Sequence, residues 1–382
     1  MKTMNYFDHA ATTPMRSEVL EAMTPYFLAQ YGNPSSIHGI GRTARAALDD
    51  SRRTLARFVG ATPNEIVFTS GGTESDNYAL FGAAEANAHK GKHIITTKVE
   101  HHAVLHAMEQ LERDGFEVTY LDVDSTGAVS VEAVRAALRE DTILVSIMYG
   151  NNEVGTIQPI ADIGEILIDH QALFHTDAVQ ALGTEAIDVK ALGIDLLSAS
   201  AHKINGPKGI GFLFMKTGVK LATRSFGGQQ ERKRRAGTEN VPGAVGFKTA
   251  AELIMVERSE RVEQYHGLAE ALLQRLDALE VEYEVNGSNR LPHIVNLYLP
   301  GIDLEPFLIM MDMRGVAISS GSACTAGSIE PSHVLTAMFG ASERTKQSVR
   351  ISFGQGNTRY DVEQLAERLA EVVSTFTNGV RK

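Results

Sequence analysis

Short runs of β-branched and aromatic residues, each followed by a stretch with helical spacing, constrain the fold of this chain more than any other feature. Turn residues bound the runs, and the stretches between them repeat apolar residues every three or four positions, as at Ala79, Ala83 and Ala84. This alternation predicts an α/β fold whose mainly parallel central sheet is covered by helices on both faces. The predicted strands are EIVFTS (65–70), HIITTKVE (93–100), FEVTYLDV (116–123), DTILVSIMYG (141–150), ALFHTDAV (172–179), DLLSASAH (195–202) and GIGFLFM (209–215).

The pattern changes near residue 256, where the alternation ends. A long amphipathic helix follows, then short strands at 293–300, 316–320 and 348–354, and a last helix at about 360–376. A chain of 382 residues is too long for one small core. We therefore predict a large domain over residues 15–256 and a smaller α+β domain over 257–382, with residues 1–14 packing on the smaller one.

Ligands bind parallel sheets of this kind at the carboxyl ends of the strands, so the residues that follow each strand are the candidates for function. The first strand runs into Gly71, Gly72 and Thr73 at the start of a predicted helix, where exposed N–H groups and the helix dipole suit a phosphate. The alternative is a plain capping box formed by Thr73 with Asp76 behind it. A nucleotide P-loop is not predicted, because its G-x-x-x-x-G-K-[ST] pattern does not occur in the sequence.

Two further predicted strands end in polar residues. Asp177 and Gln180 lie where one strand ends, and an ionised Asp at this place pairs either with a backbone N–H or with the nitrogen of a heterocycle. Ser200, His202 and Lys203 lie at the end of the next strand. An ordinary lysine is neutral in only about one copy in a few thousand at pH 7, so a nucleophilic Lys203 needs surroundings that lower its pKa or carry its proton away.

Three histidines, His101, His102 and His106, lie at the start of another predicted helix. Positions 102 and 106 share one helical face, which would allow a metal pair, but no third ligand with suitable spacing accompanies them. We predict no metal site. An imidazole lying flat on an aromatic cofactor is the functional interpretation that we prefer for one of the three.

The only cysteine of the chain, Cys324, lies in AISSGSACTAGS (317–328), among small residues that suit a loop that moves. One cysteine excludes an intrachain disulfide framework and a multi-cysteine metal site. The net charge of −11 argues against general binding to nucleic acid or to a membrane, and the basic run at 232–235 is either a solvated loop or an anion site. The start, MKTMNYFDHAATTP, lacks the apolar core of a signal peptide, and no apolar run approaches the roughly 20 residues of a membrane span. The predicted location is cytoplasmic.

A phosphate cradle, an acid for a ring nitrogen and a lysine at a strand end together suit pyridoxal 5′-phosphate. The chain resembles the cysteine desulfurases of the NifS/IscS kind, in the class V aminotransferase family of fold-type I pyridoxal-phosphate enzymes, over nearly its whole length. The motifs that carry this resemblance are YFDHAATTP, GNPSSIHGIGR, EIVFTSGGTESDN, NNEVGTIQPI, HTDAVQ, SAHKINGPKGIG, RRAGTEN, SSGSACTAGS and VRISFG.

The resemblance implies a role for each matching residue. Lys203 would bind the cofactor as a Schiff base and then move protons, His101 would stack on its ring and serve as a proton carrier, and Cys324 would receive the sulfur. Asp177 would pair with the pyridinium nitrogen, while Arg350, with Asn152, would bind the substrate carboxylate. The implied cofactor-binding residues are Gly72, Thr73, His101, Asn152, Asp177, Gln180, Ser200, His202, Lys203 and, across a dimer interface, Thr238.

The implied activity is the removal of sulfur from L-cysteine, which leaves alanine and a persulfide on Cys324. A homodimer would pass this sulfur to an acceptor protein, either an iron–sulfur cluster scaffold or a tRNA-thiolating enzyme. The SSGSAC segment is typical of the first of the two desulfurase groups. The chain ends at Lys382, soon after its last predicted helix, whereas relatives that dock a scaffold commonly carry a longer tail, so the acceptor stays open. The alternatives are a selenocysteine lyase, a class V aminotransferase and a phosphate-binding module without catalysis.

Overall fold

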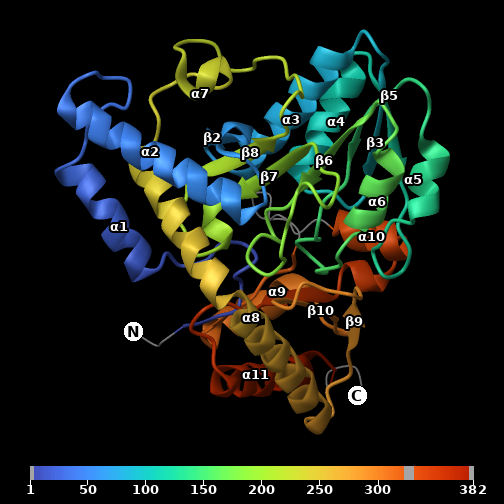
Figure 1. Cartoon of the computed structure of the whole chain (residues 1–382). Helices are drawn as coiled ribbons and strands as arrows, with labels where there is room; N and C mark the ends of the chain where they lie inside the picture. Colours follow the sequence, from blue (N-terminus) through green and yellow to red (C-terminus); the bar gives the residue numbers. More distant parts are fainter. Residues whose placement is uncertain (1–3, 322–330, 378–382) are drawn as a thin grey trace.

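The computed structural model of this chain describes residues 4–321 and 331–377 (Figure 1). The predicted catalytic residue Cys324 therefore lies outside the described residues. None of the helices in the described ranges is long and apolar enough to cross a membrane.

The larger of the sheets has the strand order β2-β8-β7-β6-β5-β3-β4. All of its neighbouring strands pair in parallel except around β8, which runs antiparallel to both β7 and β2. This confirms the mainly parallel sheet predicted from the sequence. Its strands are β2 (Ile66–Thr69), β3 (His93–Thr97), β4 (Glu117–Leu121), β5 (Thr142–Ser146), β6 (Leu173–Asp177), β7 (Leu196–Ser200) and β8 (Gly211–Met215).

Helices cover both faces of this sheet, as predicted (Figure 1). Successive residues of a strand point to opposite faces, so Ile94 packs in the core on one side while Ile95 packs on the other. On the first face lie α3 (Gly72–Asn87) and α4 (His102–Arg113), and on the second lie α2 (Gly39–Phe58), α5 (Val131–Ala137), α6 (Ile160–Leu167) and the first part of α8 (Val241–Ala278). Burial on two sides explains why the central strands carry apolar residues toward both faces, and polar residues such as Ser198, Thr176 and His175 among them are buried too.

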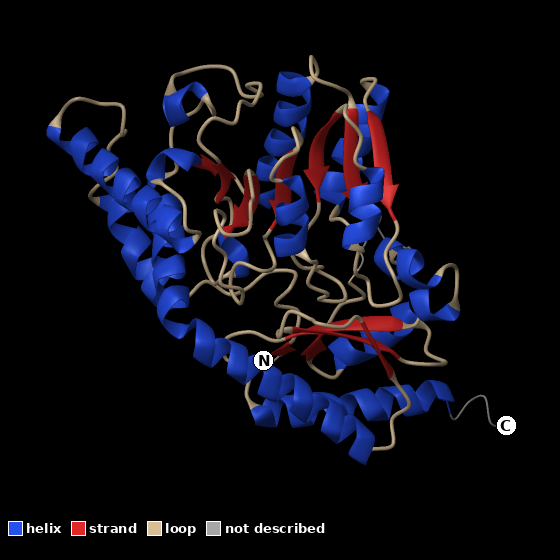
Figure 2. Ribbon diagram, turned by 45° about the vertical axis from the view of Figure 1, so that its right-hand side comes forward, coloured by secondary structure: helices blue, strands red, loops and turns tan. Residues whose placement is uncertain are grey.

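A second, smaller layer of strands forms the other core of the molecule. The strands β9 (Glu284–Asn286), β10 (Ile294–Tyr298) and β12 (Ser348–Ser352) form an antiparallel sheet, and β1 (Asn5–Tyr6) pairs in parallel with β11 (Val316–Ala317). The second part of α8 and α11 (Arg359–Thr377) cover this layer, which lies below the larger sheet in Figure 2. The remaining helices are α1 (Ser17–Leu28), α7 (Gln230–Lys233), α9 (Leu304–Met313), α10 (His333–Phe339) and the short 3-10 helices Pro63–Glu65, Ala201–Lys203 and Glu343–Thr345.

Helix α8 runs through residue 256, where the sequence pattern changes. Ile254 belongs to the core of the larger sheet, Tyr265 belongs to the core of the smaller one, and between them Val256 is 87% exposed. One continuous helix therefore links the two cores. The predicted division of the chain into two domains stays a prediction, and its boundary at 256–257 falls inside this helix.

Candidate active site

A cavity of about 380 Å³ opens where the carboxyl ends of the central strands face the smaller layer. The loops after β2, β3, β5, β6 and β7 all reach it, because parallel strands end at the same edge of a sheet. The structure thus brings most of the predicted site residues together. Those that line this cavity are Gly72, Thr73, His101, Asn152, Asp177, Gln180, Ser200, His202, Lys203 and Arg350.

Lys203 lies in the turn directly after β7, and its amine points back toward the N-terminal segment. Its Nζ donates to the carbonyl oxygen of Ala11 at 3.0 Å and also to that of Ala10. Burial, followed by the charge of Arg350, lowers the pKa of Lys203 to about 8, against the opposing effect of Asp177. About one copy in ten is then neutral at pH 7, far more than for an ordinary lysine. This is the lowered pKa that a nucleophilic lysine requires.

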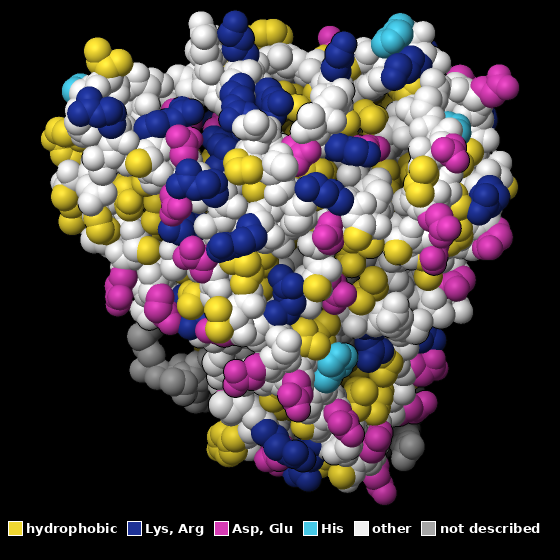
Figure 3. Space-filling view, in the orientation of Figure 1, with side chains coloured by type: hydrophobic (Ala, Val, Ile, Leu, Met, Phe, Trp, Pro, Cys, Tyr) yellow, Lys and Arg dark blue, Asp and Glu magenta, His cyan; other side chains and the backbone are white. Residues whose placement is uncertain are grey.

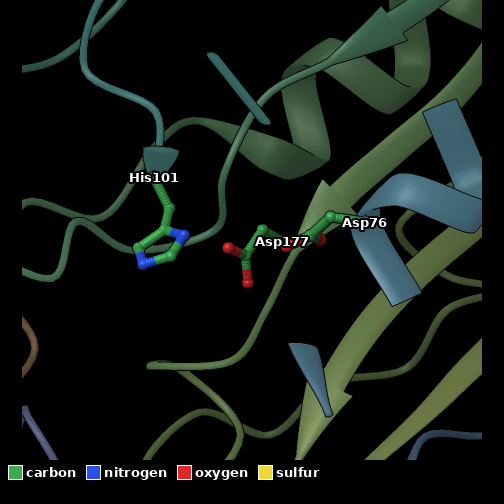
Figure 4. A group of neighbouring side chains, drawn as sticks. All are labelled: Asp76, His101 and Asp177. Carbon is green, nitrogen blue, oxygen red and sulfur yellow. The ribbon is translucent and has the colours of Figure 1, made fainter. Parts of the chain in front are cut away.

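Asp177 and His101 point toward one another across the cavity, with Asp76 behind Asp177 (Figure 4). One potential ligand atom from each of these three side chains lies within 4.8 Å of the other two. Asp177 ends β6, and its Oδ1 accepts a hydrogen bond from the Val179 N–H at 2.9 Å. His101 caps α4, with its Nδ1 accepting from the Ala103 N–H at 3.1 Å, which leaves Nε2 to carry the proton of the neutral ring.

Small and hydroxyl-bearing residues surround the first turn of α3. The helix starts at Gly72, and a Cβ on this residue would come within 2.7 Å of the Val179 side chain. The first N–H groups of such a helix have no intrahelical acceptor, and with Thr73, Ser200 and His202 beside them they can hold a phosphate. The capping box considered for this turn is wrong: the N-cap residue is Gly71, without a side-chain cap, and Asp76 turns inward.

Arg350 reaches the cavity from β12 of the smaller sheet and is 4% exposed. Its Nη1 donates to the carbonyl oxygen of Asn152 at 2.8 Å, and its Nη2 pairs with Asp8 Oδ1 at 2.7 Å. The Nε of Arg350 has no hydrogen-bond partner among the described residues. A carboxylate entering this cavity therefore finds a guanidinium with unused hydrogen-bonding capacity, and it competes with the Asp8 carboxylate for that guanidinium.

Gln180 lies beside the lysine rather than isolated on the cavity wall. Its side-chain amide donates to the Ala10 carbonyl oxygen at 2.8 Å, so it shares this acceptor with Lys203. His202 is tied to Thr12 by a contact of 3.1 Å between Nδ1 and Oγ1, and burial lowers its pKa to about 4. Both residues thus connect the N-terminal segment to the end of the sheet.

Of the predicted site residues that the structure describes, Thr238 is the one that does not line the cavity of its own chain. It lies exposed on the loop that precedes α8. A buried pair between Arg52 and Glu231 at 2.6 Å holds the start of this loop, and a pair between Arg235 and Glu74 at 2.9 Å ties it to α3.

The basic run at 232–235 divides between protein contacts and a small cavity. Arg235 is ion-paired with Glu74, and Arg234 donates to the carbonyl oxygen of Asn64 at 2.8 Å. Arg232 and Arg234 also line a separate cavity of about 180 Å³, together with Arg52 and Glu231.

The structure adds a third histidine to the pair, His102 and His106, that the sequence suggested as possible metal ligands. The rings of His102 and His106 lie 5.1 Å apart, and His333 joins them at 4.7 Å from His102. Among the described residues, however, the three-residue group with converging ligand atoms is Asp76, His101 and Asp177. That group faces the lysine, where a heterocyclic cofactor is predicted.

Sequence reasoning gave no role in the site to three buried acids: Asp76, which it considered only for a capping box, Glu100 and Glu153. Glu153 Oε2 accepts from the Ser332 hydroxyl at 2.5 Å, and burial raises its pKa to about 7. Glu100 Oε1 accepts from Thr97 Oγ1 at 2.7 Å and from the Met148 N–H at 3.0 Å, and burial raises its pKa to about 8. Glu153 and Glu100 are each adjacent in sequence to a residue in the motifs, Asn152 and His101. This adjacency is the sequence signal from which both acids could have been found.

Comparison with known proteins supplies the family. Residues 5–365 match the family model described as "Aminotransferase class-V". The chain is 58% identical to "Putative cysteine desulfurase IscS 1" of Bacillus subtilis, over 97% of this chain and 99% of that one. It is 51% identical to "Cysteine desulfurase IscS" of Methanosarcina thermophila, over 98% of this chain and 93% of that one. A solved structure titled "NIFS-like protein" superposes with a TM-score of 0.91 at 37% identity, covering 98% of this chain and 100% of the other. The chain therefore belongs to the class V aminotransferase family and, within it, to the cysteine desulfurases of the IscS and NifS kind.

Proposed function

We propose that this chain is a pyridoxal-phosphate enzyme that removes sulfur from L-cysteine, leaving alanine and a persulfide on Cys324. The observation that carries the proposal is the buried Lys203 amine, with its pKa lowered to about 8, in the same cavity as Asp177 and Arg350. An amine, an acid for a ring nitrogen and a guanidinium for a carboxylate are the three groups that such a reaction requires.

The residues present fit pyridoxal phosphate. The α3 N-terminus with Thr73, Ser200 and His202 would hold the phosphate, Asp177 would face the ring nitrogen, and Lys203 would bind the aldehyde carbon. His101, opposite Asp177, supplies a flat ring, and Gln180 and Asn152 supply amides. When bound, pyridoxal phosphate supplies an electron sink for charge that develops on the substrate.

Side chains of the protein bind the substrate, move protons and receive the sulfur. Arg350 binds and orients the substrate carboxylate, which replaces the Asp8 carboxylate as the partner of the guanidinium. Lys203, once released from the cofactor, accepts and returns a proton at Nζ, because its lowered pKa makes both forms available near neutral pH. His101 carries a proton at Nε2 close to the substrate sulfur. The thiolate of Cys324 attacks that sulfur, the carbon–sulfur bond breaks, and a persulfide remains on Cys324.

A homodimer is part of this proposal. Apolar side chains gather at the left edge of Figure 3, over α1 and the start of α2. There Phe27, Leu28, Tyr31 and Ile37 expose 57 to 91% of their surface, more than single scattered apolar residues would explain. A second copy is the natural cover for such a surface, and Thr238 would then complete the phosphate site of the neighbour. The location proposed is the cytoplasm, and the acceptor is an iron–sulfur scaffold or a tRNA-thiolating enzyme.

The experiment is a product assay with L-cysteine and a thiol reductant. Alanine and sulfide should form in equal amounts, and Lys203→Ala should abolish both, whereas Lys190→Ala, which removes an exposed lysine, should not change the rate. Borohydride reduction of the parent protein should attach the cofactor to Lys203. Formation of a keto acid in place of alanine would instead identify an aminotransferase, and undiminished turnover by Lys203→Ala would overturn the assignment of the lysine.

A further inference from the structure

Asp76 is a buried acid without a role in the reaction just described. It projects from the first turns of α3, is 1% exposed, and lies behind Asp177 as seen from His101 (Figure 4). One of its oxygens lies within 4.8 Å of an oxygen of Asp177. Two carboxylates this close, and both buried, cannot both carry a charge near neutral pH.

The surroundings of Asp76 contain no compensating cation. Among the described residues no lysine or arginine lies within 4.0 Å of its carboxylate, and its Oδ1 has no hydrogen-bond partner. His175 Nε2 is 3.7 Å from that oxygen, but burial lowers the pKa of His175 to about 3, so the ring is neutral. Ser198, whose hydroxyl lies 3.1 Å from His175 Nε2, favours the ionised form of Asp76, whereas the nearby Glu100 opposes it.

Asp177 is better placed to hold the negative charge of the pair. Burial raises the pKa of Asp177, but the Val179 N–H that it accepts and the charge of Lys203 oppose this rise. For Asp76, burial, followed by the charge of Asp177, raises the pKa well above the usual range, and only Ser198 opposes this rise. The two carboxyl groups therefore divide into one charged and one neutral group.

We propose that Asp76 is a positioning residue that stays protonated at neutral pH, so that the single negative charge of the pair lies on Asp177, facing the cavity. A neutral carboxyl group fills the space behind Asp177 without taking its charge or admitting a competing cation. The charge assignment concerns the chain alone. Only its consequence for the cofactor rests on the proposed function.

Thermal unfolding of the cofactor-free protein tests the charge assignment. The unfolded chain loses the Asp76 proton above about pH 4, whereas the folded protein retains it, so this residue lowers the stability of the parent as the pH rises. Asp76→Asn keeps the shape of a neutral acid but does not titrate. Its Tm relative to the parent should therefore increase by about 3–5 °C between pH 5 and pH 8. A Tm difference that is the same at each pH would show that Asp76 is ionised across this range and would overturn the proposal.

Infrared spectroscopy gives a second measurement that does not depend on the variant. Parent protein labelled with ¹³C-aspartate should show the C=O band of a protonated aspartic acid at pH 7, and its absence would overturn the proposal even if Asp76→Asn does not fold. The band should disappear in Asp76→Asn and persist in Asp177→Asn.

The affinity for pyridoxal phosphate, followed by absorbance, separates the consequence from the charge assignment. Asp76→Asn should bind within about threefold of the parent, and Asp177→Asn at least about tenfold more weakly. Equal binding by all three proteins would contradict the proposed function at Asp177 and leave the thermal and infrared results to decide the state of Asp76.

Discussion

Lys203 is a residue whose surroundings change its reactivity directly. Burial and the Arg350 charge lower its pKa, so its reactivity should rise through pH 8 rather than above pH 10. We predict that acylation of Lys203 in cofactor-free protein, measured by mass spectrometry against pH, has a midpoint near 8. Arg350→Met should move the midpoint upward, because Arg350 is the charge that favours the neutral amine, against Asp177 and Asp8. A midpoint at the value of an ordinary lysine in the parent would contradict this.

The Arg350 guanidinium is expected to act through two parallel hydrogen bonds that a lysine cannot reproduce. Arg350→Lys should raise the KM for cysteine by about 10- to 100-fold, which corresponds to the loss of one charge-assisted hydrogen bond. The kcat should change much less, because the reacting atoms lie elsewhere. Steady-state kinetics decide the matter, and an unchanged KM would mean that another group binds the carboxylate.

The residues predicted from the sequence and those it missed differ in a physical way. Asp177 and Lys203 follow strands with a strong local signal, and the ends of parallel strands meet at one edge whatever the strand order. Asp76 lies inside a helix, and its importance comes from a neighbour more than a hundred positions away in the chain. Such pairings depend on strand order and register, which local patterns do not specify.

Helix α7, just before the loop that leads to α8, has an unfavourable backbone conformation. Glu231, Arg232 and Lys233 have φ values of 45°, 60° and 67°, a region that residues other than glycine seldom adopt. The buried pair between Arg52 and Glu231 fixes it, and Glu231 also accepts the Phe68 N–H at 3.1 Å.

Removing one partner of that pair should be costly. Arg52→Ala is expected to lower the free energy of unfolding by about 3–5 kcal/mol, because Glu231 is left buried and unpaired. The adjacent Arg53 pairs with Asp50 at the surface, so Arg53→Ala should cost less than about 1 kcal/mol. Urea denaturation compares the two variants. Similar midpoints for both would show that the buried pair does not hold the loop.

Helix α8 shows how an element can be predicted in one half and missed in the other. Its second half repeats large apolar residues at helical spacing and was recognised from about residue 257. Its first half packs small residues such as Ala244, Ala250 and Ala251 against the larger sheet, and small residues give a weak amphipathic pattern. The change of pattern at residue 256 thus marks a change of neighbours and not the start of a helix.

At the scale of the whole molecule, the exposed apolar surface on α1 and the start of α2 bears on assembly. Phe27→Asp combined with Leu28→Asp should convert a dimer to monomers and weaken binding of pyridoxal phosphate, since Thr238 would no longer reach a neighbour. Ile168→Asp, at a similarly exposed apolar residue after α6, should leave the dimer intact. Sedimentation velocity provides the measurement, and a cofactor-saturated monomeric parent would disprove the dimer.

The first residues of the N-terminal segment contact residues that are more than 300 positions later in the chain. Asn5 and Tyr6 pair with Val316 and Ala317, and Asp8 reaches Arg350. On the ribosome the first ten residues therefore emerge long before their partners exist, while the larger sheet can already form. The carbonyl groups that meet Lys203 can take their places once Gln180 and Lys203 have been made, whereas Asp8 finds its partner only after residue 350 has been made. Nascent chains that end before residue 350 should consequently lack the guanidinium for the substrate carboxylate, so that competence for the reaction comes later than the larger sheet and its cofactor site.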